Sequence, residues 1–514
     1  MSTVKTKART ILHQSSRGKR VERGFVSDSI AVGVVFALAL TFGQRLIGFG
    51  RGILFCRLMT DQQLGQWSMI WSYLMLLAPL AVLGLPGCFG KFTEHYRQRG
   101  QLKTFIGRIA WISVVMTILL AGVIMAFPTQ ISWILFREPG HRELVRILGA
   151  ALIVVSASNF LGALMESLRQ VRAVTIMRFI TGATFAAVGT GLLLVWDDGA
   201  SAATMAFAIS CLVGMVPAIW VLWVYRDGIR NDGVPLTQSK MWKRVAPFAI
   251  WMWTTNLLSN LIEITDRYML LHWSNLSPDL AQGSIGQYHS GRVIPLLMVS
   301  VAVMLAGVLI PYLSQAWESG ERARATKQLN WSVKLASVAF TMGGVVVLLC
   351  SPFLFDCVLQ GRYNDGLAVL PLTLVYCIWF AIVTIAQDYL WIAEKGKWAT
   401  LISGAALVVN ILMNLILIPS FGLQGAVVAT ACGSATLVAF VLAMNHRFGC
   451  RADIGIWFCA ALPLLLLLSK ALAVVAIAAV GLACLSTNLI LNDEEKSDLL
   501  NKIRERKNRD ISKD

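Results

Sequence analysis

Long apolar runs recur along almost the whole chain, and they limit the possible folds more than any other feature. The run over residues 105–127, for example, contains no charge after Arg108. A helix needs roughly 20 apolar residues to cross a bilayer core of about 30 Å, so runs of this length predict membrane-spanning helices. Only 14% of the 514 residues are charged, against roughly 25% in a soluble chain. We therefore expect an all-α polytopic membrane protein.

The apolar runs divide into about fourteen transmembrane helices. They are expected at 29–55, 64–89, 105–127, 143–167, 173–196, 203–225, 245–273, 288–315, 332–356, 366–392, 397–418, 423–445, 454–469 and 471–491. The expected order is a basic tail (1–28), an N-terminal six-helix bundle (29–225), a linker (226–244), a C-terminal six-helix bundle (245–445), two additional helices (446–491) and a charged tail (492–514). The first run is too long for a signal-peptide core and lacks a cleavage site, which favours a retained helix.

Lys and Arg residues gather in alternate connections between these helices, and this alternation predicts the topology. The rich connections contain Lys91, Arg97, Arg99, Lys103, Arg169, Arg172, Arg226, Arg230, Lys240, Lys243, Arg244, Arg322, Arg324, Lys327, Lys395, Lys397, Arg447 and Arg451. The opposite connections are mostly poor in both residues, with 128–142 as the exception. Because positive residues stay on the cytoplasmic side, we expect a bacterial cytoplasmic membrane protein with both termini inside. This distribution explains the net charge of +17 without nucleic-acid binding.

A short motif repeats at the start of two expected helices. Leu64-Gly65-Gln66-Trp67 opens the second helix, and Ile285-Gly286-Gln287-Tyr288 opens the eighth. A six-helix unit repeated in the same orientation is the pattern of parallel repeats in transporters, which bind substrate near the midplane between the repeats. The repeat therefore predicts two related bundles with a site between them.

The first expected helix carries polar residues that are costly inside a membrane and are therefore candidates for substrate binding. Gln44, Gly48 and Arg51 share one helical face, and Arg45 lies deeper in the span than Arg51. The alternative for both arginines is snorkelling, in which the long side chain reaches the membrane interface.

The seventh expected helix carries a polar stripe. Asn256, Asn260, Glu263 and Arg267 recur at i, i+4, i+7 and i+11. Glu263 is a candidate for ion coupling, and the alternative is that it forms with Arg267 a neutral pair that holds helices together. Asp266, beside the stripe, has no such partner on its own helix, so it is our first candidate for coupling transport to H⁺ or Na⁺. Asn256 and Asn260 are candidates for substrate binding.

Four further positions in expected helices are polar. Arg292 enters the eighth helix just before Pro295, which permits a bend. Asp388 follows Thr384 by one helical turn and is a further candidate for ion coupling. Asn410 and Asn414 share a face of the eleventh helix, and we interpret them as hydrogen-bonding residues between helices.

The sequence contains no recognisable catalytic or metal-binding motif. It has no GxxxxGK(S/T) phosphate loop, no GxSxG and no HExxH. The 10 cysteines are scattered, without the spacing of a metal site. A membrane-embedded sugar polymerase or ligase is disfavoured, because the external connections are too short for the usual catalytic loop. We therefore expect a protein that is not an enzyme and carries neither a cofactor nor a metal.

Two segments resemble a known family. Residues 51–89 contain Arg57-Leu58, a short polar loop from Thr60 to Gln63, and then Gly65 and Trp67. This order resembles the start of Wzx-type polysaccharide flippases, and 418–426 looks like the turn between helices 11 and 12 of that family. These proteins belong to the multidrug/oligosaccharidyl-lipid/polysaccharide exporter superfamily. The resemblance implies two six-helix bundles forming a V around a central cavity.

The lipid II flippase branch of the superfamily resembles the chain at three arginines. Arg45 and Arg51 match two arginines six apart in its first helix, and Arg292, after Tyr288, matches one entering helix eight. The resemblance implies that these arginines bind the substrate's pyrophosphate, with Gln44 beside them. The expected function is alternating-access export of an isoprenoid-pyrophosphate-linked glycan whose tail stays among the membrane lipids. A lipid II flippase and a multidrug or cation exporter are the alternatives.

Overall fold

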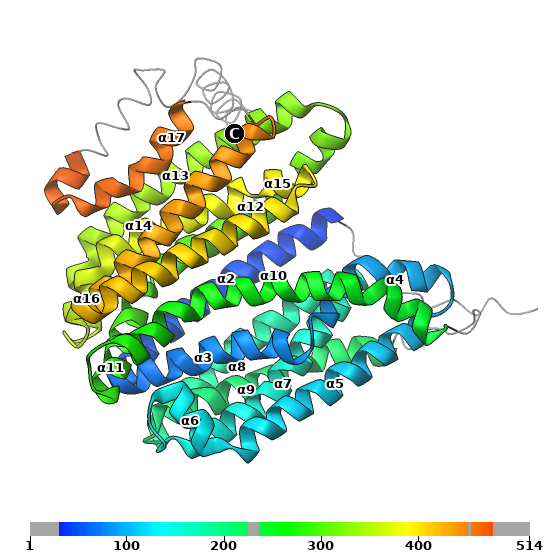
Figure 1. Cartoon of the computed structure of the whole chain (residues 1–514), viewed down its shortest axis with the longest axis horizontal. Helices are drawn as coiled ribbons and strands as arrows, with labels where there is room; N and C mark the ends of the chain where they lie inside the picture. Colours follow the sequence, from blue (N-terminus) through cyan, green and yellow to red (C-terminus); the bar gives the residue numbers. More distant parts are fainter. Residues whose placement is uncertain (1–29, 225–235, 451–453, 476–514) are drawn as a thin grey trace, which may run out of the picture.

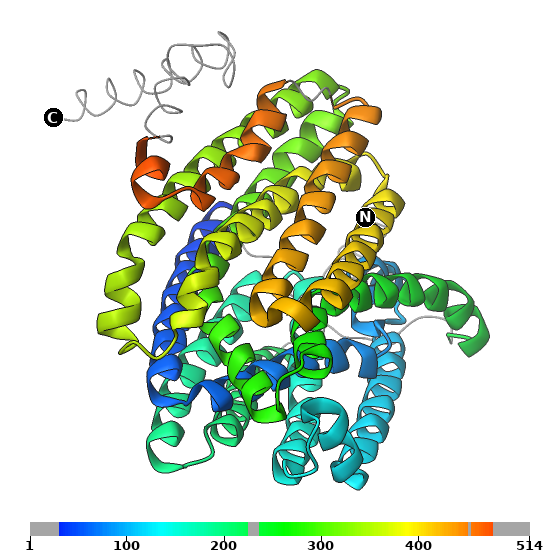
Figure 2. The same cartoon turned by 60° about the vertical axis from the view of Figure 1, so that its left-hand side comes forward.

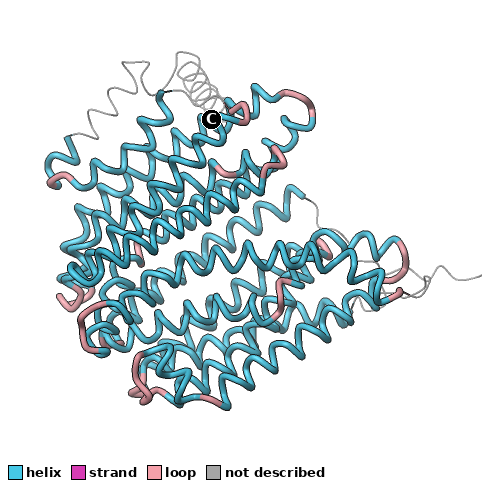
Figure 3. The backbone as a smooth tube through the Cα atoms, in the orientation of Figure 1, coloured by secondary structure: helices cyan, strands magenta, loops and turns pink. Residues whose placement is uncertain are grey.

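The computed structural model describes residues 30–224, 236–450 and 454–475. These residues form helices joined by short connections, with no strand among them (Figures 1 and 3). The all-α expectation is therefore confirmed. The tails 1–28 and 492–514 and residues 226–235 of the linker lie outside the described residues, as does most of the fourteenth expected helix.

The first half of the chain contains α2 (Ile30–Leu58), α3 (Asp61–Ala81), η1 (Leu85–Cys88), α4 (Phe89–Gln98), α5 (Leu102–Ala126), α6 (Pro128–Phe136), α7 (Arg142–Ser167), α8 (Val171–Val195) and α9 (Gly199–Val224). The second half contains α10 (Gln238–Trp273), α11 (Pro278–Arg292), α12 (Pro295–Glu318), α13 (Arg322–Pro352), η3 (Phe353–Val358), α14 (Asn364–Ala386), α15 (Asp388–Ile392), α16 (Gly396–Arg447), α17 (Ile454–Ala461) and η4 (Leu462–Leu467). The two halves form two lobes, which lie close together at α3 and α11 and diverge toward α4 and α15 (Figures 1 and 2). This is the expected V.

Eight helices among the described residues are long and apolar enough to cross a membrane, and nine are if the bent α3–α4 pair counts as one span. The protein is therefore a multi-pass membrane protein, whereas the number fourteen stays a prediction. The second expected helix, 64–89, is not one straight rod, because the chain bends by 60° after α3. Pro79 weakens the end of α3 by removing a backbone donor, and Gly84 takes a φ of 65° that few other residues tolerate.

Several expected boundaries were wrong. The connection 128–142 contains helix α6, and α10 begins at Gln238 instead of 245, which shortens the linker. The eighth helix is split into α11 and α12, which break just before Pro295, because proline cannot donate the hydrogen bond that would continue α11. The turn between the eleventh and twelfth expected helices is present as a kink in α16 at Gly422, with a φ of 51°.

The repeated motif forms the contact between the lobes at the crossing of α3 and α11. A Cβ atom on Gly65 would lie 1.8 Å from the carbonyl oxygen of Gln282, and one on Gly286 would lie 1.9 Å from that of Asp61. Beside them Gln66 Nε2 donates to Gln282 Oε1 at 2.7 Å. The motif thus places one glycine on α3 and one on α11 where the backbones of these two helices touch. In α11 it lies within the helix rather than at its start.

We expect Gly65→Leu to separate the two lobes at this crossing. The new side chain would overlap the α11 backbone, and such overpacking costs about 1–3 kcal/mol or more. The measurement is a disulfide crosslink between Gln62→Cys and Asp279→Cys, whose native side chains are hydrogen-bonded at 2.5 Å, with the native cysteines replaced. Crosslinking should fall in Gly65→Leu and persist in Gly122→Leu, where a Cβ atom meets nothing within 4 Å. Equal crosslinking in both variants would contradict the tight crossing.

Candidate functional site

A cavity of about 360 Å³ lies where the lobes diverge, and α2 supplies most of its polar lining. Its walls include Gln44, Arg45, Gly48 and Arg51 from α2, Trp67 and Trp71 from α3, Thr181 and Phe185 from α8, Phe207 from α9, His289 from α11, and Leu296 and Ser300 from α12. A second cavity of about 280 Å³ shares Gln44, Thr181 and Phe207 with it. We call the first of these the central cavity. The sequence-predicted residues Gln44, Arg45 and Arg51 are thus brought together there.

The side chain of Arg51 is held by aromatic rings rather than by a carboxylate. Its Cζ atom lies 4.1 Å from the ring centroid of Phe185 and 5.8 Å from that of Phe55. In the part of the chain that the structure describes, neither Arg45 nor Arg51 forms an ion pair. A cation–π contact orients a guanidinium while leaving its N–H groups available to an anion. Arg51 is therefore placed to bind a ligand.

Aromatic side chains line one wall of the central cavity. Trp67 lies 5.8 Å from Trp71 and 5.6 Å from Phe185, measured between ring centroids, and Trp71 lies 4.9 Å from Phe207. These edge and tilted contacts fix the orientation of each ring. His289, which also lines the cavity, has its Nδ1 atom 3.2 Å from Ser68 Oγ of α3. The described lining residues combine two guanidinium groups with flat apolar faces and include no carboxylate.

Arg292 does not line the central cavity, contrary to its expected grouping with Arg45. Its Nη2 atom lies 3.8 Å from Glu263 Oε1, and its Cζ atom lies 5.2 Å from the ring of Tyr288. Glu263 also lies 3.9 Å from the buried Arg267, which donates to Ser72 Oγ at 2.8 Å. The pair that the sequence allowed between Glu263 and Arg267 is thus present, and Arg292 lies close to the same carboxylate. Two guanidinium groups share one carboxylate, so the cluster keeps a net positive charge.

The two asparagines of the α10 stripe lie outside the central cavity. Asn260 Nδ2 donates to the carbonyl oxygen of Asn256 at 2.8 Å, within the same helix, and Asn256 is exposed. Neither lines the neighbouring cavity either. The structure therefore does not group them with Arg45 and Arg51, and their expected contact with substrate stays a prediction.

Asp266 is the centre of a buried hydrogen-bond network. Asn410 Nδ2 and Asn414 Nδ2 both donate to its Oδ1 atom at 2.9 Å. Thr430 Oγ1 and the Tyr288 hydroxyl donate to Oδ2, at 2.5 and 3.3 Å. The carboxylate is only 4% exposed and joins α10 to α11 and to both segments of α16. Asn410 and Asn414 do bond between helices, as expected, and their partner is the proposed coupling residue.

Asp388 lies apart from this network, at the start of α15. It is 5% exposed, and its Oδ2 atom has no hydrogen-bond partner among the described residues. Thr384, one turn earlier, donates to the backbone of Phe380 instead. The expected role of Asp388 in ion coupling therefore stays a prediction.

Sequence reasoning missed the aromatic wall and His289. Trp71, Phe185 and Phe207 occur inside apolar runs, where they cannot be told from lipid-facing or core side chains. The sequence did offer one indication that Trp67 matters, because this residue is the last of the repeated motif. Thr430 carried none, since a single threonine in an apolar helix usually bonds its own backbone, as Thr430 also does with Ala426.

Two helical lobes around a cavity with a positive lining define a multi-pass membrane protein of the transporter type. The family described as polysaccharide biosynthesis protein matches residues 30–317, and the chain belongs to that family. A curated relative, the uncharacterized membrane protein YabM of Bacillus subtilis (strain 168), is 25% identical over 271 residues, which are 51% of this chain and 50% of the relative. The match thus spans half the length of that relative.

Solved structures of two transport proteins share the fold. An inward-facing multidrug resistance MATE family transporter of the MOP superfamily superposes with a TM-score of 0.65 and 13% identity, over 81% of this chain and 98% of that one. The lipid II flippase MurJ, in an inward closed conformation, superposes with a TM-score of 0.63 and 15% identity, over 88% of this chain and 98% of that one. The chain therefore shares the fold of these transporters, as the resemblance in the sequence implies.

Proposed function

We propose that the protein moves an isoprenoid-pyrophosphate-linked glycan across the bacterial cytoplasmic membrane by alternating access. The observation that carries the proposal is the central cavity, in which Arg45 and Arg51 face no carboxylate. An anionic group entering this cavity meets two cations, whereas an organic cation meets repulsion. The lipid II flippase MurJ, which shares the fold, supports a lipid-linked anionic substrate of this kind.

The lining matches the parts of such a substrate. Guanidinium groups bind phosphate oxygens through planar, multidentate hydrogen bonds, which suits a pyrophosphate. The faces of Trp67 and Trp71 suit the apolar faces of sugar rings. The isoprenoid tail needs no protein pocket, because it stays in the bilayer while the head crosses. The cluster of Glu263, Arg267 and Arg292 adds positive charge next to the cavity, since Arg292 lies about one helical turn after the lining residue His289 on α11.

We further propose that Asp266 couples transport to H⁺ or Na⁺. The groups that contact its carboxylate are donors, namely the N–H₂ groups of Asn410 and Asn414 and the hydroxyls of Thr430 and Tyr288. A small hard cation prefers oxygen ligands, which the two amides would supply after rotation of their side chains. The Asn414 Oδ1 atom is buried without a hydrogen-bond partner among the described residues, and such an acceptor could instead face a bound cation. Binding of H⁺ or Na⁺ would cancel a buried charge that joins α10 to both segments of α16, and would thereby bias the packing of the second lobe.

We expect the purified protein to be stabilised by an isoprenoid pyrophosphate and not by the matching isoprenoid alcohol or by tetraphenylphosphonium. A ligand present at about 100 times its Kd stabilises the folded state by roughly 2.7 kcal/mol, which is readily seen as a rise in Tm. The alcohol controls for the tail alone, and the lipophilic cation represents the substrates of a multidrug exporter. A larger rise with the cation than with the pyrophosphate would favour the exporter function.

A further inference from the structure

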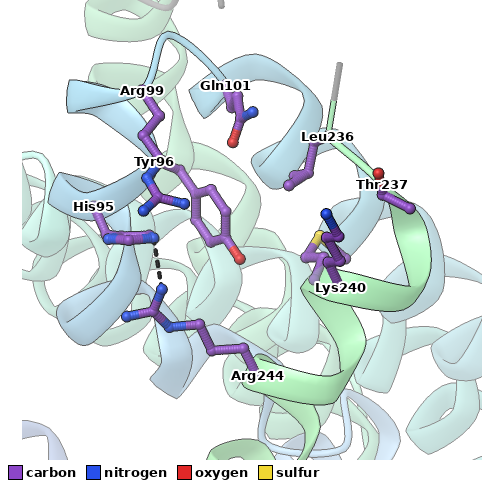
Figure 4. Close-up of a pocket in the computed structure, with 9 residues that line it drawn as sticks. His95, Tyr96, Arg99, Gln101, Leu236, Thr237, Lys240 and Arg244 are labelled. Carbon is purple, nitrogen blue, oxygen red and sulfur yellow. Dashed lines mark hydrogen bonds between the residues drawn. The ribbon is translucent and has the colours of Figure 1, made fainter. Parts of the chain in front are cut away.

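A second positively charged cavity lies at the opposite end of the helices from the α3–α11 crossing. It has a volume of about 480 Å³ and lies between α4 and the beginning of α10 (Figures 1 and 4). Its lining comprises His95, Tyr96, Arg99, Gln101, Leu236, Thr237, Lys240, Met241 and Arg244. These residues belong to two connections rich in Lys and Arg, so the topology predicted from the sequence places the cavity on the cytoplasmic side. We call it the α4–α10 cavity.

Three cationic side chains converge on the α4–α10 cavity. Arg99, Lys240 and Arg244 line it and are exposed at its mouth, and none of the described lining residues is acidic. The nearby Glu94 is already paired, with Arg97 at 3.2 Å. The positive charge of this cavity is therefore not neutralised by its own lining.

His95 holds Arg244 in position. Arg244 Nη1 lies 2.8 Å from His95 Nε2, as the dashed line in Figure 4 shows. Burial, together with the charges of Arg244 and Arg99, lowers the pKa of His95. A neutral imidazole can accept the hydrogen bond from Arg244, which leaves the other N–H groups of the guanidinium to an incoming anion.

The first turn of α10 adds to the positive potential. Thr237, the N-cap residue, forms no capping hydrogen bond with its side chain, and it lines the cavity. The first backbone N–H groups of a helix have no partner within the helix, so they attract anions. This helix terminus reinforces the three side chains of the cavity.

Below its charged mouth the cavity is apolar. Tyr96 stacks on Phe105 with 4.4 Å between ring centroids, and Met241 is fully buried. On α10, Pro247 and Trp251 follow Lys240 at i+7 and i+11, on the same helical face, and both are exposed. Exposed apolar residues thus continue along the face of α10 that carries Lys240. A free phosphate ion would not contact these apolar residues, whereas the acyl chain of a lipid would pack against them.

We propose that the α4–α10 cavity binds the headgroup phosphate of an anionic phospholipid in the cytoplasmic leaflet. Basic pockets between transmembrane helices on the cytoplasmic side bind such headgroups. The phosphate lies among Arg99, Lys240 and Arg244, and an acyl chain follows the face of Pro247 and Trp251. The lipid bridges α4 of the first lobe and α10 of the second half of the chain.

The test uses the full-length protein in neutral detergent with radiolabelled short-chain phosphatidylglycerol. We expect saturable binding that is about tenfold tighter than binding of phosphatidylcholine with the same chains. The double variant Lys240→Gln/Arg244→Gln should lose about thirtyfold in affinity, because two basic residues that attract anionic lipid are removed. Hydrogen–deuterium exchange should show protection of 95–101 and 236–244 upon addition of the lipid.

The matched control is Lys103→Gln/Lys243→Gln, which removes the same charge from exposed residues that do not line the cavity. This control should bind phosphatidylglycerol within about twofold of the wild type. An equal loss in both double variants would overturn the site in favour of diffuse surface charge. Displacement of the lipid by inorganic phosphate at equal concentration would show that the cavity binds free phosphate, and would overturn the proposal that it binds a lipid.

Discussion

Arg45→Ala and Arg51→Ala should each lower the rate of flipping of a lipid-linked pyrophosphate glycan about ten- to hundredfold. A hydrogen bond to a charged group contributes roughly 1.5–3 kcal/mol, and either substitution removes such bonds to the pyrophosphate from the central cavity. Lysine at either position should restore activity only in part, because an ammonium group lacks the planar fork of donors. The measurement is the initial flipping rate in proteoliposomes at equal protein content.

Arg57→Ala provides the matched control for these two variants. Arg57 lies on the same helix, in its last turn, and is exposed outside the central cavity. Its substitution removes one positive charge from α2 without touching the lining, so flipping should stay within about twofold of the wild type. Full activity of Arg51→Ala, or an equal loss in Arg57→Ala, would contradict the role of the cavity arginines.

Asp266→Asn should remove the dependence of flipping on an imposed H⁺ or Na⁺ gradient. The amide cannot ionise. Its N–H₂ group would also face the N–H₂ groups of Asn410 and Asn414, which donate to the carboxylate of Asp266 in the wild-type protein. We expect the ratio of rates with and without the gradient to fall to about one, whereas Glu263→Gln should keep most of its response. Glu263 is a weaker candidate because it is partly exposed and lies beside Arg267 and Arg292.

The two variants are compared under the same proton and sodium gradients, with protein stability measured in parallel. An isosteric change that leaves buried donors unpaired costs about 1–3 kcal/mol, so a modest fall in Tm is expected for Asp266→Asn. A wild-type response to both gradients in Asp266→Asn would show that the residue only holds helices together.

The sequence was sufficient for the class of fold and for part of the site. Helix length and hydropathy identify spans without knowledge of packing, and burial of a charge in an apolar run singles out Asp266 and Arg51. The repeated motif marked Gly65 and Gly286, although their contact with the opposite backbone depends on the crossing of α3 and α11.

The remaining features depend on contacts between distant segments. Asp266 could not be paired with Asn410 and Thr430 from sequence, because the kink at Gly422 brings the two segments of α16 onto α10. Arg292 was grouped with Arg45, yet it faces Glu263. Helix α6 was missed because its nine residues resemble a short external loop. Each error concerns packing, which the pattern of a single segment does not contain.

Flipping of a fluorescent, isoprenoid-pyrophosphate-linked oligosaccharide in proteoliposomes tests the central claim most directly. An impermeant glycosidase, added outside, reports how much of the glycan reaches the outer leaflet over time. The proposed function predicts that wild-type vesicles expose the glycan faster than protein-free vesicles and faster than vesicles carrying Arg45→Ala/Arg51→Ala. Equal exposure in all three preparations, while the same vesicles transport an organic cation, would contradict it.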